Sequence, residues 1–118
     1  MPSNGTQVIA HRGASSAAPE NTLAAFQLAW AQGVDGVECD IRLSADQQIV
    51  CLHDADTGRV GDQQLVAAEA AYTDLAQVRL HGFDAAEAAH IPLLQTVLKQ
   101  KPAHSQLLIE VKTGAAIA

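Results

Sequence analysis

Four short apolar segments of this sequence carry charged or histidine side chains toward their carboxyl ends, and this recurring pattern constrains the fold most. The segments are Gln7–His11, Val34–Leu43, Ile49–His53 and Leu107–Lys112. Their length and apolar character predict buried strands. The expected order is a strand, a helix, a strand hairpin, two helices and a strand. This order is typical of an α/β protein with a mainly parallel sheet.

Three segments between these strands have the features of helices. The first begins with Asn21 or Thr22 as its N-cap and ends at Gly33. The second runs over Thr73–Leu80, and the third opens at Ile91-Pro92 with Pro in its first turn. The side chains expected to face the core from the first and third helices are Leu23, Phe26, Trp30, Leu94, Val97 and Leu98.

The connection between the second and third apolar segments is too short for a parallel crossover, which needs a dozen or more residues. Only about five residues separate them, so Ile49–His53 is expected to fold back antiparallel along Ile41–Ser44. If Ser44 pairs with Ile49, His53 falls opposite Asp40. A slip of one residue would change this register.

The length of the chain limits its architecture. With 118 residues it has the size of one domain and is too short for a complete (β/α)8 barrel, which needs about 250 residues. Thirteen acidic and seven basic residues give a net charge of −6. A chain this acidic lacks the attraction for phosphate backbones that basic proteins use, so nucleic acid is not an expected partner.

Export and membrane insertion are also not expected. The first residues are polar, without a basic segment followed by an apolar one, and no apolar stretch approaches the ~20 residues of a membrane-spanning helix. Two cysteines, Cys39 and Cys51, are too few for a disulfide framework. We therefore predict a cytoplasmic protein without integral membrane association.

Polar groups that a buried strand would normally exclude gather at the carboxyl ends of the expected strands, where α/β proteins place their sites. Carboxylates two residues apart on a strand share one face. Carboxylates brought together in this way repel one another unless a hard divalent cation neutralises them, and nearby basic groups suit a phosphate. The residues concerned are His11, Arg12, Glu38, Asp40, His53, Asp54, Glu110 and Lys112.

A series of short motifs, in order along Val8 to Lys112, resembles the signature of the glycerophosphodiester phosphodiesterases, which belong to the barrel-fold phosphodiesterases similar to phosphatidylinositol-specific phospholipase C. The motifs are His11-Arg12-Gly13, Pro19-Glu20-Asn21-Thr22, Glu38-Cys39-Asp40, His53-Asp54, Ile91-Pro92 and Glu110-Val111-Lys112. The resemblance implies the amino-terminal part of a TIM (β/α)8 barrel, about three barrel strands plus a hairpin. Residues 1–118 would then form a single incomplete domain.

The resemblance also implies metal-dependent hydrolysis of a glycerophosphodiester to an alcohol and glycerol 3-phosphate. It places Ca²⁺ or Mg²⁺ on Glu38, Asp40 and Glu110. It makes His11 and His53 the acid/base pair, without deciding which is the acid. Substrate phosphate would bind Arg12 and Lys112. The supporting residues would be Glu20, Asn21 and Asp54.

Other interpretations remain open at this stage. The chain as it stands could be a non-catalytic or inactive fragment, able to self-associate through an open barrel edge. A related phospholipase-like phosphodiesterase with another head-group preference is a second alternative. Two segments depart from the family pattern: the loop 56–61 is shortened, and Leu93 stands where a helix-capping Thr is common.

Overall fold

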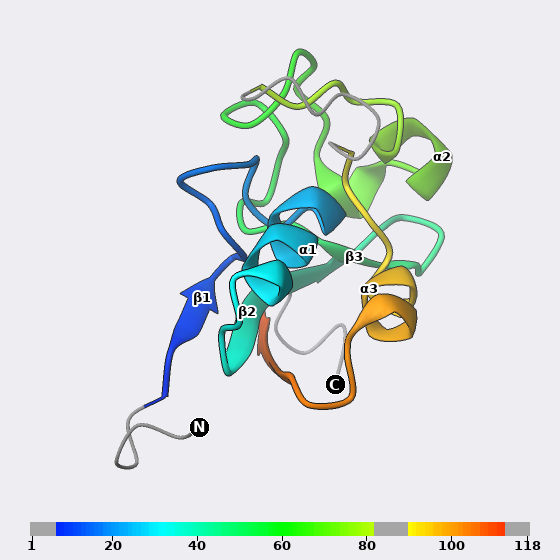
Figure 1. Ribbon diagram of the computed structural model, residues 1–118. Coiled ribbons are helices and arrows are strands. Elements are labelled where there is room, and N and C mark those ends of the chain that lie inside the picture. The colour runs from blue at the N-terminus through cyan, green and yellow to red at the C-terminus, as the bar shows by residue number, and fades with distance from the viewer. Residues whose placement is uncertain (1–6, 82–89, 113–118) are drawn as a thin grey trace.

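The computed structural model describes residues 7–81 and 90–112, and these form a mixed α/β structure (Figure 1). The order of strands and helices follows the order expected from the sequence, with one additional short 3-10 helix, η1. The elements are β1 (Ile9–His11), α1 (Leu23–Ala31), β2 (Gly36–Leu43), β3 (Ile49–Cys51), η1 (Ala67–Glu69), α2 (Tyr72–Leu75), α3 (Leu94–Gln100) and β4 (Gln106–Val111).

Strand β2 is the centre of a four-stranded sheet. It pairs in parallel with β1 over 36–38 and with β4 over 36–41, and antiparallel with β3 over 41–43. Because β4 occupies one edge of β2 over most of its length, β1 and β3 share the other edge. The parallel strands therefore end at the same end of the sheet, as the sequence pattern predicts.

The main core lies between the sheet and two helices. Side chains of α1 and α3, including Phe26 and Val97, pack on the face of β2 that carries Val37, Cys39 and Ile41. Glu38 and Asp40 alternate with these apolar side chains and so project from the opposite face. Burial of one face of β2 thus determines where its carboxylates point.

The ends of α1 confirm the helix signals. Thr22 is the N-cap, and its side-chain oxygen accepts a hydrogen bond from Ala25 N at 3.2 Å. The helix ends at Ala31, and Gly33 adopts a left-handed conformation with φ of 78° that reverses the chain. Asn21 does not cap the helix. Its backbone is left-handed, with φ of 58°, and its side chain forms hydrogen bonds with Asp40 instead.

The hairpin between β2 and β3 is antiparallel as expected, but its register differs by one residue from the predicted one. Ser44 N donates to Gln48 O at 2.9 Å, and Leu43 pairs with Ile49. A three-residue loop makes this possible because Gln47 adopts a φ of 64°, a conformation typical of such loops. Leu52 therefore lies opposite Asp40, the position expected for His53, and its N–H donates to Asp40 O.

Three further helix predictions are wrong in detail. Helix α2 ends at Leu75 instead of Leu80, because the chain beyond it extends to bridge Gly61 with Leu80. The third helix does not open at Ile91-Pro92. Pro92 precedes the N-cap Leu93 and so lies outside the first turn of α3, and the side chain of this N-cap makes no capping hydrogen bond. Leu98 is 48% exposed instead of buried, because Leu94 and Val97 make the contact with the core.

None of the helices in residues 7–81 and 90–112 has the length and apolar character needed to cross a bilayer.

Candidate functional site

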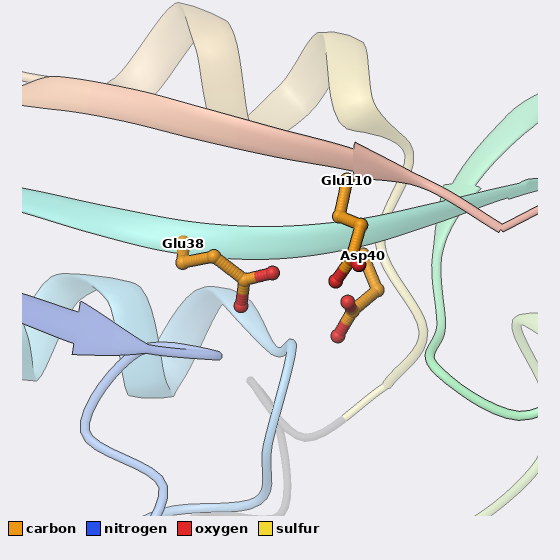
Figure 2. A group of neighbouring side chains, drawn as sticks. All are labelled: Glu38, Asp40 and Glu110. Carbon is orange, nitrogen blue, oxygen red and sulfur yellow. The ribbon is translucent and has the colours of Figure 1, made fainter.

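Three carboxylates from two parallel strands meet on one side of the sheet. Glu38 and Asp40 project from β2 and Glu110 projects from β4, all toward the same side of the sheet (Figure 2). The pairing of Asp40 with Glu110 across β2 and β4 puts these two side by side. One oxygen atom from each of the three carboxylates lies within 4.8 Å of the others. This spacing would suit a single cation bound by all three.

Asp40 is the most enclosed of the three, with no exposed surface. The Asn21 side chain holds it twice: Nδ2 donates to Asp40 Oδ2 at 3.0 Å, and Oδ1 accepts from the Asp40 backbone N–H at 3.1 Å. The other oxygen, Asp40 Oδ1, is buried and has no hydrogen-bond partner among residues 7–81 and 90–112. A buried carboxylate oxygen without a donor is costly, so this atom fits the role of a metal ligand.

Two basic side chains flank the carboxylates. Arg12 Nε lies 3.3 Å from Asp40 Oδ2. Lys112 Nζ lies 3.2 Å from Glu110 Oε1 and 3.9 Å from Asp40 Oδ1. Glu110 is the outermost member, with 56% of its side chain exposed, so the cluster is open on the β4 side. The arrangement presents positive charge beside a carboxylate cluster, which is what an anionic, metal-bound substrate would require.

The pKa values of the two carboxyls on β2 move in opposite directions. Burial and the negative charge of Asp40 raise the pKa of Glu38. Burial also acts to raise the pKa of Asp40, but the groups around it, first among them the Asn21 side chain that donates a hydrogen bond to it, outweigh this effect, so the pKa is lowered. Asp40 is therefore the carboxyl that the surrounding groups keep ionised.

The end of β1 and the turn that follows it bring His11 and Arg12 into this region. Arg12 and Gly13 both have positive φ values, 59° and 78°, so the chain reverses sharply. The Arg12 backbone N–H donates to Glu38 Oε1 at 3.2 Å, and His11 Nε2 lies 3.5 Å from the same oxygen. His11 is 67% exposed, which leaves its ring accessible from solvent.

The second histidine has a carboxylate partner of its own. His53 Nδ1 lies 2.7 Å from Asp54 Oδ1. Hydrogen bonds from Arg59 and His53 lower the pKa of Asp54 to about 2, so near neutral pH this carboxylate only accepts. His53 Nδ1 must therefore carry the hydrogen, which leaves Nε2 of the neutral ring with a free lone pair.

Hydrogen bonds and ion pairs link all the site residues that the sequence singled out. Glu20 Oε2 accepts from Arg12 Nη1 at 2.8 Å, and Arg59 bonds both Glu20 and Asp54. Through these links His53, which follows β3, is connected to the carboxylate cluster. The connected residues are His11, Arg12, Glu20, Asn21, Glu38, Asp40, His53, Asp54, Glu110 and Lys112.

Sequence reasoning missed two arginines of this region. Arg42 donates from Nε and Nη2 to His53 O at 3.0 and 2.7 Å, and from Nη1 to Lys112 O at 3.4 Å. Its position two residues after Asp40 places it on the same strand face, a signal that could have revealed it. Arg59 is the only basic residue of the acidic loop 54–62, which is a comparable signal.

The fold and the site define a class of protein: an α/β barrel-type protein with its functional groups at the carboxyl ends of parallel strands. Residues 11–116 match the model of the glycerophosphoryl diester phosphodiesterase family, and the chain belongs to that family.

Individual relatives agree with this membership. The chain is 32% identical over 114 residues to a glycerophosphodiester phosphodiesterase of Bacillus altitudinis, covering 95% of this chain and 46% of the relative. The crystal structure of the Agrobacterium tumefaciens glycerophosphodiester phosphodiesterase matches with a TM-score of 0.82 and 31% identity, over 90% of this chain and 46% of that one.

A phosphodiesterase of Oleispira antarctica, solved in complex with the product sn-glycerol-3-phosphate, matches with a TM-score of 0.80 and 35% identity. The match covers 95% of this chain and 47% of the Oleispira chain. The present chain thus spans less than half the length of the relatives it matches.

Proposed function

We propose that this chain carries the metal-binding and acid/base residues of an enzyme that hydrolyses glycerophosphodiesters to an alcohol and glycerol 3-phosphate. The observation that carries the proposal is the carboxylate cluster around Asp40, whose buried Oδ1 accepts no hydrogen bond from the described residues, with two histidines and two basic groups around it. Family membership and the product bound to the Oleispira relative support the choice of substrate.

The metal would be held by Glu38, Asp40 and Glu110. Oxygen ligands of this kind favour the hard cations Ca²⁺ and Mg²⁺. When bound, such an ion would polarise the phosphate and offset its developing negative charge. Arg12 and Lys112 would bind phosphoryl oxygens from either side of the cluster.

The two histidines would move the protons. The Nε2 of His53, kept free by the bond from Nδ1–H to Asp54, would accept the proton of the attacking hydroxyl. His11 would protonate the oxygen of the departing alcohol as its bond to phosphorus breaks. The resemblance to the family suggests that the free hydroxyl of the glycerol attacks first, and water then opens the cyclic phosphate with the two proton transfers reversed.

The test uses a chain of the relatives' full length and measures hydrolysis of glycerophosphocholine in Ca²⁺ or Mg²⁺. We expect His11→Ala and His53→Ala each to lower kcat by about 10²–10⁴-fold. His104→Ala, which changes an exposed histidine, is the matched control. Turnover by both active-site variants at the rate of the control would refute the assignment. Profiling other head groups separates this function from a related phospholipase-like activity.

Metal binding has an independent readout in the 118-residue chain. Titration with Ca²⁺ or Mg²⁺ is expected to raise Tm, because an ion that binds the folded chain stabilises it. Asp40→Asn would abolish this rise, whereas Asp46→Asn, which changes a carboxylate of the hairpin loop, would retain it. An equal rise in both variants would exclude the cluster as the metal site.

A second proposal concerns the 118-residue chain itself, which we propose to be an incomplete barrel domain. In the described part of the chain β4 pairs with β2 alone, and its side chains Leu108, Ile109 and Val111 are 43%, 44% and 47% exposed. An open apolar strand of this kind invites association. Light scattering would show self-association, whereas a monomer with full turnover would contradict this proposal.

We also propose a cytoplasmic location for the protein. It is supported by Cys39 and Cys51, which are both buried and both free. Fractionation of cells that express the protein would test it.

A further inference from the structure

We propose that Arg59 is a positioning residue that holds Arg12 and His53 in one geometry; this inference rests on the proposed function. The Arg59 guanidinium bridges two carboxylates from different loops. Its Nε lies 2.8 Å from Asp54 Oδ2 and its Nη2 lies 3.4 Å from Asp54 Oδ1. The same Nη2 donates to Glu20 Oε1. The loop after β1 and the loop after β3 are thereby tied together.

The backbone that carries Arg59 is firmly held. Thr57, two residues earlier, has no exposed surface. Its hydroxyl donates to Gln63 O at 2.5 Å and accepts from Leu65 N at 3.0 Å, while its carbonyl accepts from Gly61 N at 2.9 Å. The Arg59 side chain is 54% exposed, yet it extends from this closed loop directly onto its two partners. The hydrogen bonds of the loop therefore fix the backbone from which the Arg59 side chain reaches these two carboxylates.

On one side, Arg59 acts on the phosphate-binding group through Glu20. Glu20 divides its two oxygens between two guanidinium groups, with Oε2 on Arg12 at 2.8 Å and Oε1 on Arg59. Because Arg59 takes part of the negative charge of Glu20, Arg12 keeps more of its attraction for an anion. Without Arg59, Glu20 would neutralise Arg12 alone, and phosphate would bind more weakly.

On the other side, Arg59 acts on the histidine through Asp54. Asp54 Oδ1 contacts both His53 Nδ1 and Arg59 Nη2, and the fork of Arg59 fixes the plane of this carboxylate. The two carboxylates in turn raise the pKa of the Arg59 guanidinium, so it remains charged. If Arg59 is removed, Asp54 can rotate, and the bond that holds the hydrogen on His53 Nδ1 loosens.

The experiment compares Arg59→Ala and Arg59→Lys with Arg79→Ala, a matched removal of an exposed arginine outside this network. In the 118-residue chain, ¹⁵N NMR at about pH 8 reports the tautomer of the neutral His53 ring. A titration with inorganic phosphate gives Kd. We expect Arg59→Ala to mix the two tautomers and to raise Kd about 3- to 10-fold. Arg59→Lys should recover part of the wild-type tautomer of His53 and part of the wild-type Kd, and Arg79→Ala should change neither.

A merely structural role for Arg59 would lower Tm without changing these two readouts. Asp54→Asn tests the route of action: in that background Arg59→Ala should leave the His53 signals unchanged, while phosphate binding still weakens through Glu20. Wild-type values of tautomer and Kd in Arg59→Ala would overturn the proposal. In a chain of full length, Arg59→Ala should raise KM and lower kcat. Absence of turnover in the wild type would instead count against the proposed function and leave the NMR test valid.

Discussion

Replacing Asn21 is expected to destabilise the fold strongly, although this residue lies in a loop. Asn21 is only 2% exposed, and its amide both donates to the Asp40 carboxylate and accepts from the Asp40 backbone N–H. It does so from a left-handed backbone conformation, with φ of 58°. Asn tolerates this conformation better than most residues with a side chain.

The cost of Asn21→Ala has three parts. Loss of a hydrogen bond to a charged group costs about 1.5–3 kcal/mol, and an unpaired buried N–H costs about 1–3 kcal/mol. Ala in the left-handed region adds about 1 kcal/mol. Entry of water into the space of the lost amide offsets some of this, so we expect a net loss of about 3–5 kcal/mol. For a chain of this size that corresponds to a fall in Tm of about 10–20 °C.

Urea denaturation of the 118-residue chain, followed by circular dichroism, measures the free energy of unfolding. Asn21→Gly is the informative companion, because Gly loses the same hydrogen bonds without the backbone strain. It should therefore be about 1 kcal/mol more stable than Asn21→Ala. The reasoning would be refuted if Asn21→Ala unfolded within 1 kcal/mol of the wild type, or if Gly gave no advantage over Ala.

Three further predictions concern single contacts. The pKa of Asp54, lowered from 3.8 to about 2 by Arg59 and His53, means that its ionised form stabilises the folded state above about pH 4 and that this stabilisation is lost as the pH falls through 2. The difference in unfolding free energy between wild type and Asp54→Asn should accordingly shrink from pH 4 to pH 2. A difference that stays constant over this range would contradict a stabilising role for the ionised Asp54. Gly61→Ala would place its Cβ 2.3 Å from Val78 Cγ1 in the core and should cost about 1–3 kcal/mol in urea denaturation. Gly33→Ala, with open space around it but a φ of 78°, should cost only about 1 kcal/mol, and the reverse order would disprove the packing argument. Thr22→Ala should lower thermal stability by about 1 kcal/mol through loss of the N-cap, with Thr22→Ser restoring most of it; equal Tm values for Ala and Ser would exclude a capping role.

Local patterns in the sequence were sufficient for the helix and strand features that depend on near neighbours. The start and end of α1 follow from Thr22 and Gly33, and the face on which Glu38 and Asp40 project follows from the alternation of side chains along a strand. These features need no knowledge of the rest of the chain, because they are properties of consecutive dihedral angles and of helix termini.

Features that depend on distant partners could not be derived in this way. The one-residue error in the hairpin register comes from the left-handed conformation of Gln47, which composition does not reveal. Helix α2 ends early because Leu80 pairs with Gly61 nineteen positions away along the chain. Leu98 fits the apolar pattern of α3, yet the contacts of its neighbours with the sheet leave it exposed.

The sequence by itself determined which chemical groups stand at the carboxyl ends of the strands and, through their resemblance to a known signature, the family. The tertiary structure alone decided how those groups neutralise and orient one another. The hydrogen bonds of Asn21 to Asp40, and those of Arg59 to Glu20 and Asp54, join residues from distant segments of the chain. Such contacts depend on where the turns direct each loop, and the energy of a hydrogen bond or ion pair depends on distances and burial that exist only in the folded chain.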